Sequence, residues 1–118
     1  MEERLQEALQ FANYTQTLNN QLHKLKIKTE GMLLFAEGGG KFTINQQLIC
    51  FLDFVVRSGQ TETTLLDDNK SPVHIADVAT FLNKVTTRYF DVTNDYYREA
   101  QIIKKSRSVK SILDLGDV

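Results

Sequence analysis

Apolar residues recur every three or four positions through the first third of the chain, which is the spacing of one face of a helix. The stripe consists of Ala8, Phe11, Thr15, Leu18, Leu22, Leu25, Thr29, Met32 and Ala36. We expect one long helix over residues 2–37, because no proline interrupts it and Gly31 is its only glycine. Gly38-Gly39-Gly40 then ends the helix, since glycine resists helix and takes positive φ freely.

A second stripe with the same spacing predicts a long helix over residues 77–105, with Asp77 as its N-cap. It consists of Val78, Phe81, Leu82, Val85, Tyr89, Val92, Tyr96, Ala100 and Ile103. Phe90 and Tyr97 lie beside this line and widen the apolar face of the helix.

Shorter elements are predicted directly after the first helix. Residues 41–44 alternate in polarity and are rich in β-branched and aromatic side chains, which predicts a short strand. Asn45 is a typical N-cap, and residues 46–58 after it predict a short helix that stops at Gly59. This helix is apolar nearly all round, so we expect it to be buried on most sides, with Cys50 as a core thiol.

A β-hairpin is predicted before the second long helix. Residues 63–66 and 72–75 flank the turn-forming residues 67–71, and Pro72 places its strand at an edge or at a strand start. The turn faintly resembles a calcium-binding loop, but such a loop needs Gly at its sixth position and Glu at its twelfth. Those positions hold Pro72 and Val78, so a polar hairpin turn is the favoured interpretation.

These elements predict a mostly α (α+β) fold. Two long antiparallel helices form a coiled-coil-like hairpin, with a small insert of one short helix and a β-hairpin. We expect a single domain over residues 1–105, with the insert at 38–76 and a C-terminal tail at 106–118. In this arrangement residues near 32 lie opposite residues near 82.

Length and charge narrow the class of protein. The 118 residues, 42% hydrophobic and 25% charged, fit one ordinary globular domain. A net charge of −1 gives no global field toward nucleic acid or an anionic membrane. We expect a cytoplasmic protein, because the N-terminus is acidic, no apolar run could span a bilayer, and one cysteine allows no internal disulfide.

The sequence offers little for catalysis or cofactor binding. Gly38–Lys41 resembles part of a phosphate-binding loop, but Phe42 stands where that loop needs Ser or Thr. His74 and Asp77 are three apart, as in some metal sites, although capping explains Asp77. Cys50 with His74 is the one conceivable nucleophile and base, and no nearby cation activates the thiol. We therefore expect no enzyme activity, no metal and no cofactor.

The apolar face of the helices is wider than one copy of the chain can cover. We expect it to bind a second copy, another protein, or both. The tail carries a further apolar cluster, which either folds back on the helices or docks on a partner. The residues expected at the protein interface are Tyr14, Phe90, Tyr97, Ile112, Leu113 and Leu115.

A basic segment offers an alternative function in nucleic-acid binding, since cations beside aromatic side chains bind single strands without sequence preference. The candidate contacts are Lys104, Lys105, Arg107 and Lys110. A second cluster, Lys24, Lys26 and Lys28, is expected near the opposite end of the hairpin, so the two clusters do not form one groove.

Several short patches, spread over most of the chain, resemble small proteins of contractile-tailed phages of the T-even kind and their cyanobacterial relatives. The patches are Asn13-Tyr14, Leu18–Gln21, Gly38–Phe42, Leu65–Asn69, Arg88–Phe90 and Lys105–Val109. The resemblance implies a phage origin and a role in virion assembly or in phage DNA metabolism. It would place the protein in the host cell cytoplasm or in the virion, and it transfers no functional residue.

Overall fold

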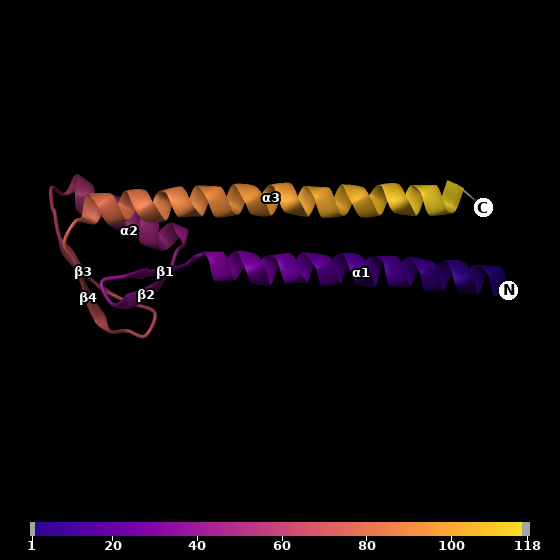
Figure 1. The fold of residues 1–118 in the computed structure, drawn as a ribbon, viewed down its shortest axis with the longest axis horizontal. Helices are drawn as coiled ribbons and strands as arrows, with labels where there is room; N and C mark the ends of the chain where they lie inside the picture. Colours follow the sequence, from indigo (N-terminus) through magenta and orange to yellow (C-terminus); the bar gives the residue numbers. More distant parts are fainter. Residues whose placement is uncertain (1, 117–118) are drawn as a thin grey trace. The chain divides into compact units, whose positions relative to one another are not determined.

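The computed structural model describes the backbone of residues 2–116 and the side chains of residues 2–106. Over this range the chain is mostly helical, with three helices and two antiparallel β-hairpins, which confirms the predicted class at this level. The elements, in chain order, are α1 (Glu2–Met32), β1 (Leu34–Glu37), β2 (Gly40–Thr43), α2 (Gln46–Arg57), β3 (Thr63–Leu66), β4 (Pro72–Ile75) and α3 (Val78–Gly116) (Figure 1).

The chain divides into two compact units. The central unit holds residues 29–94 and therefore contains both hairpins, α2, the end of α1 and the first part of α3. The terminal unit holds residues 1–28 and 95–118. The predicted single domain over 1–105 with a tail at 106–118 stays a prediction.

The first helix is shorter than expected. It ends at Met32, and residues 34–37 form β1, which pairs with β2 so that Glu37 lies opposite Gly40. Gly38 and Gly39, with φ of 59° and 83°, make the two-residue turn between the strands. Two positive φ values suit the twist of a hairpin, so these glycines reverse a β-ribbon rather than stop a helix as predicted.

The predicted caps and stop of α2 are confirmed. Asn45 is the N-cap, and its side chain accepts a hydrogen bond from the Leu48 N–H at 2.8 Å. At the other end Gly59 has φ of 84°. Its N–H donates to the Val56 carbonyl, and the Gln60 N–H donates to the Val55 carbonyl. This pair of bonds is the glycine-dependent Schellman ending.

The second hairpin and the start of α3 also follow the prediction. Strands β3 and β4 pair with Leu66 opposite Pro72 and Thr63 opposite Ile75. Asp77 caps α3, because its carboxylate accepts from the Thr80 N–H at 3.1 Å and from the Thr80 hydroxyl at 2.7 Å. The helix was predicted to end at residue 105 and instead continues to Gly116.

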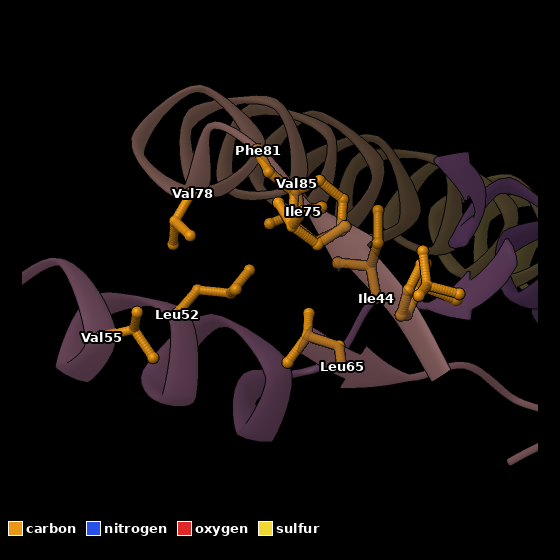
Figure 2. Packing of buried hydrophobic residues seen from close by; sticks show 10 residues of the cluster. Ile44, Leu52, Val55, Leu65, Ile75, Val78, Phe81 and Val85 are labelled. Atoms are coloured by element: carbon orange, nitrogen blue, oxygen red, sulfur yellow. The ribbon is translucent and has the colours of Figure 1, made fainter. Parts of the chain in front are cut away.

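One apolar core holds the central unit together. Val78 of α3 points toward Leu52 of α2, and Phe81 and Val85 lie beside Ile75 of β4 (Figure 2). The ring of Phe81 also packs on Phe35 and Phe42 of the first hairpin. Phe81, Ile44, Leu52, Val78 and Val85 are fully buried. Burying a large apolar side chain contributes about 1.5–3 kcal/mol, so this cluster dominates the stability of the unit.

Helix α2 buries one face and not most sides, which corrects the prediction. Leu52 and Val55 face the core, while Phe51 is 46% and Phe54 is 66% exposed. Cys50 is also exposed, so it is not a core thiol. The apolar residues of α2 therefore form two different faces, one packed in the core and one open to solvent.

Candidate interaction surfaces

The outer edge of β2 is closed by the turn that joins β3 to β4. The Lys41 N–H donates to Asp67 Oδ2 at 3.4 Å, and the Thr43 N–H donates to Asp68 Oδ1 at 3.1 Å. Thr43 Oγ1 donates to Asp68 Oδ2 at 2.7 Å, and the Asp68 N–H donates to the Lys41 carbonyl at 2.8 Å. Asp67 and Asp68, which lie in the turn compared above with a calcium-binding loop, thus join the two hairpins by hydrogen bonds.

The outer edge of β1 is open. In this antiparallel pair Lys41 lies opposite Ala36 and Thr43 opposite Leu34, and the N–H groups of Lys41 and Thr43 point away from β1. In a non-hydrogen-bonded pair the backbone groups of both residues point away from the partner strand. The N–H and C=O groups of Leu34 and Ala36 therefore point out from the free edge of β1. Within the described residues, no hydrogen bond takes up these groups.

A hollow of about 420 Å³ adjoins this open edge on the outer face of the ribbon. Its lining residues are Leu34, Phe35, Ala36, Gly39, Gly40, Lys41, Asp67 and Asn69. Gly40, one of these residues, packs closely on the second hairpin, because a Cβ there would overlap Cγ2 of Val73. The hollow is apolar along β1 and polar along the β3–β4 turn.

The inner face of β1 packs on α3. The ring of Phe35 lies 6.0 Å from that of Phe81, and the guanidinium of Arg88 lies 5.7 Å from the centre of the Phe35 ring. Arg88 also donates to the Met32 carbonyl at 3.2 Å, and Lys84 lies 3.9 Å from Glu37. None of the ion pairs among the described residues involves Arg88, so its charge has no carboxylate partner there.

A second apolar surface lies on the outer face of α2. Cys50, Phe51 and Phe54 are exposed along the helix, and Arg57 is exposed at its C-terminal end. Arg57 pairs with Asp53 at 2.9 Å, and both side chains are open to solvent. This surface was not predicted, because the helix was expected to be covered on most sides.

The described members of the predicted interface differ in exposure. Phe90 in the central unit is 57% exposed, and Tyr97 in the terminal unit is 70% exposed, both on α3. Tyr14 is half-buried. Ile112, Leu113 and Leu115 lie outside the residues whose side chains the structure describes.

Within the terminal unit, Lys28 Nζ lies 3.6 Å from Glu99 Oε1. A hollow of about 390 Å³ follows, lined by Gln21, Lys24, Ile102, Ile103 and Ser106. The expected register, with residues near 32 opposite residues near 82, is therefore shifted, because Arg88 contacts Met32 and Glu99 contacts Lys28. It was built on a first helix ending at residue 37 and a second ending at 105, and neither end was correct.

The basic residues are closer together than predicted. Lys24 lines the same hollow as Ile103 and Ser106, which flank the exposed Lys104 and Lys105. The two basic clusters were expected at opposite ends of the hairpin, and the corrected register brings their segments side by side in the terminal unit. Arg107 and Lys110 lie outside the described side chains.

The residues considered for catalysis or metal binding have other contacts. His74 Nε2 lies 3.4 Å from Glu62, and both side chains are exposed. The Thr80 hydroxyl, followed by the Thr80 N–H, lowers the pKa of Asp77 below its usual value, as expected for a cap. Among the residues that the structure describes, no three His, Cys, Asp or Glu side chains are placed to hold a metal ion.

No helix in the described part of the chain has a stretch long and apolar enough to cross a bilayer. Comparison of the chain with protein-family models, with curated proteins and with solved structures finds no match. Function must therefore be inferred from the surfaces of this chain.

The open edge of β1 was missed in the sequence, although a signal for it exists. Gly38-Gly39 between segments 34–37 and 40–43 is a typical two-residue hairpin turn. The helical spacing of Met32 and Ala36 continued the stripe across this point and concealed the turn.

Proposed function

We propose that this chain is a non-enzymatic protein–protein interaction module that associates with itself, with another protein, or both. In the proposed arrangement α1 and α3 pair as a coiled-coil-like antiparallel hairpin. The Lys28–Glu99 ion pair supports this pairing, because it joins residues of α1 and α3. Exposed pairs of this kind add only about 0–1 kcal/mol, so the apolar stripes must supply most of the stabilisation.

The observation that carries this proposal is the exposure of large apolar side chains on regular helices. Phe90 and Tyr97 are 57% and 70% exposed on α3, and Phe54 is 66% exposed on α2. Aromatic residues are enriched at the centres of protein interfaces, where each contributes through desolvation and packing. Single exposed apolar residues are common, but a helix face that repeats them favours a docking surface.

A double variant of α3 tests the proposal. Phe90→Ser with Tyr97→Ser should weaken association while leaving helicity largely intact, because both side chains already contact solvent. The matched control is Thr87→Ser with Asn94→Ser, two exposed polar positions with the same seven-residue spacing. Sedimentation velocity measures association, and circular dichroism measures helicity.

Three outcomes are informative. Loss of association in the aromatic variant alone supports the proposal. Equal association in wild type, aromatic variant and control would exclude this face as the interface. Unfolding of the aromatic variant would show that Phe90 and Tyr97 belong to the core, which would also contradict the proposal.

The proposed setting is phage virion assembly, with the chain as an assembly or scaffolding factor in the host cytoplasm or in the virion. Its support is the resemblance of short patches such as Gly38–Phe42 and Leu65–Asn69 to small phage proteins. A binding module without catalytic groups suits such a role. Co-purification of the chain with assembling phage particles, lost in the aromatic variant, would test it.

A second candidate is an accessory factor that contacts nucleic acid in phage recombination or transcription. The observation that favours it is the position of Lys24 beside the segment that carries Lys104 and Lys105, which gathers basic residues in the terminal unit. Binding through several phosphates weakens steeply as salt rises. Retention on single-stranded DNA at low salt, lost at moderate salt and in a Lys104→Ala, Lys105→Ala variant, would support it. Absence of retention at low salt would remove it.

A further inference from the structure

The β1–β2 ribbon has one protected edge and one unprotected edge. Asp67 and Asp68 occupy the edge of β2. The edge of β1 carries no proline or lysine, Leu34 and Ala36 are exposed on it, and its one charged residue, Glu37, is half-buried beside Lys84. Proteins normally block such an edge, because its free N–H and C=O groups pair readily with another strand.

We infer that β1 pairs antiparallel with β1 of a second copy of this chain, forming a four-stranded sheet across a two-fold axis. The inference rests on the self-association proposed above and gives it a specific surface. The register is Leu34 of one copy opposite Ala36 of the other. Each such pair exchanges two N–H···O=C bonds, and the two-fold axis repeats the pair. This register satisfies every outward-pointing backbone group of Leu34 and Ala36.

The same register brings apolar side chains together on both faces of the new sheet. Phe35 lies opposite Phe35 of the second copy, on the face that packs against α3. On the outer face Leu34, which is 38% exposed, lies opposite Ala36 of the second copy and beside its hollow. Cross-strand aromatic pairs stabilise a sheet in addition to the area they bury.

Charge complementarity selects a second copy as the occupant. In this register Glu37 lies opposite Leu33 of the second copy. Arg88 of that copy is adjacent, because its guanidinium contacts the Met32 carbonyl and the Phe35 ring. Arg88 has no carboxylate partner within the described residues, and Glu37 has one ion pair of 3.9 Å with Lys84 of its own chain. In the dimer Glu37 of one copy therefore also pairs with Arg88 of the other, twice per dimer.

The size of the contact sets the expected affinity. A four-residue strand buries far less than the roughly 1,200–2,000 Å² of a stable interface. The dimer should therefore form reversibly as concentration rises, with further stabilisation wherever exposed helix residues of the two copies meet.

Ala36→Pro is the first test. Proline at residue 36 removes the outward-pointing N–H of that residue and breaks no hydrogen bond within the ribbon. Edge strands tolerate proline at such positions. Ala36→Ser is the matched control, because it keeps the N–H. In sedimentation velocity, wild type and Ala36→Ser should dimerise over the same concentration range, and Ala36→Pro should need at least about tenfold more protein. Equal association of all three would overturn the inference.

Charge reversal gives a second test that does not depend on proline. Glu37→Arg and Arg88→Glu should each dimerise at least about tenfold more weakly, since like charges then face each other twice. An equimolar mixture should recover association, because both contacts in the mixed dimer join opposite charges. A mixture that associates no better than the separate variants would contradict the register.

Hydrogen exchange of the wild-type Ala36 amide guards against a folding artefact. The amide should exchange freely in dilute protein and be protected in concentrated protein. Association that depends on Phe90 and Tyr97, with the Ala36 amide unprotected throughout, would leave the proposed function standing and refute the strand pairing. A full chain that stays monomeric at every concentration would refute the strand pairing and the self-association on which it rests.

Discussion

Gly40 is the position where the two hairpins approach most closely, and Gly40→Ala tests that packing. An added Cβ would overlap Cγ2 of Val73 and lie 3.2 Å from Cβ of Asp67. Val73 is 6% exposed and β-branched, so it cannot rotate away easily. Asp67 is held in place by the N–H groups of Asn69 and Ser71 at 3.0 and 2.9 Å.

The cost can be worked from these contacts. Overpacking of this kind costs about 1–3 kcal/mol. The Gly-to-Ala change also restricts the unfolded chain, which offsets about 0.4–1 kcal/mol. We therefore expect a net loss on the order of 1–2 kcal/mol in the free energy of unfolding, out of a total of about 5–15 kcal/mol. For a small domain this lowers Tm by about 4–8 °C per kcal/mol.

Urea unfolding followed by circular dichroism would measure this loss, and Val73→Ala provides the rescue. Val73→Ala alone leaves a cavity, but in the double variant the new methyl group at residue 40 partly fills it. The two changes should therefore cost at least about 0.5 kcal/mol less together than the sum of the single costs. Gly39→Ala is the control, because no atom lies within 4 Å of its Cβ and its cost comes from a φ of +83°. Full additivity of Gly40→Ala with Val73→Ala would refute the close approach of the hairpins.

Three further predictions follow from single residues. Gly31→Ala should stabilise α1 by about 0.5–1 kcal/mol, because nothing lies within 4 Å of its Cβ and its φ is not positive; a destabilised variant in urea unfolding would contradict this. The pKa of Asp77 is lowered in the fold, so its cap stabilises the fold at pH above the pKa of the unfolded chain, about 3.9. This stabilisation is lost as the pH falls through the pKa of the folded chain. Wild type should therefore lose stability relative to Asp77→Ser between pH 7 and pH 3, and a constant difference would argue against the cap. Cys50 should react with a thiol reagent in the folded protein nearly as fast as in urea, and protection until unfolding would show that α2 is covered.

Local signals in the sequence located most of the central unit. The caps Asn45 and Asp77, the stop at Gly59 and the strands around Asp67–Ser71 each depend on side chains within a few residues of the element that they define. Such interactions are already encoded in short segments, which is why their positions agree with the structure.

Features that depend on contacts distant in sequence were predicted less well. Residues 34–37 fit a helical stripe equally well, and it is the packing of Phe35 on Phe81, with the pairing to β2, that makes them a strand. Likewise the sequence of α2 alone does not determine which apolar face packs against the core, because that choice depends on contacts with other elements. Ile112, Leu113, Leu115, Arg107 and Lys110 stay predictions, because the structure does not describe their side chains.

Association of the full chain tests the central claim most directly: the apolar helix residues that one copy leaves exposed are used for binding. Sedimentation velocity over a wide concentration range should show a mass that rises from the 13.5 kDa of a single chain, with the Phe90→Ser, Tyr97→Ser variant needing a higher concentration for the same rise. A wild-type mass of 13.5 kDa at every concentration would contradict self-association.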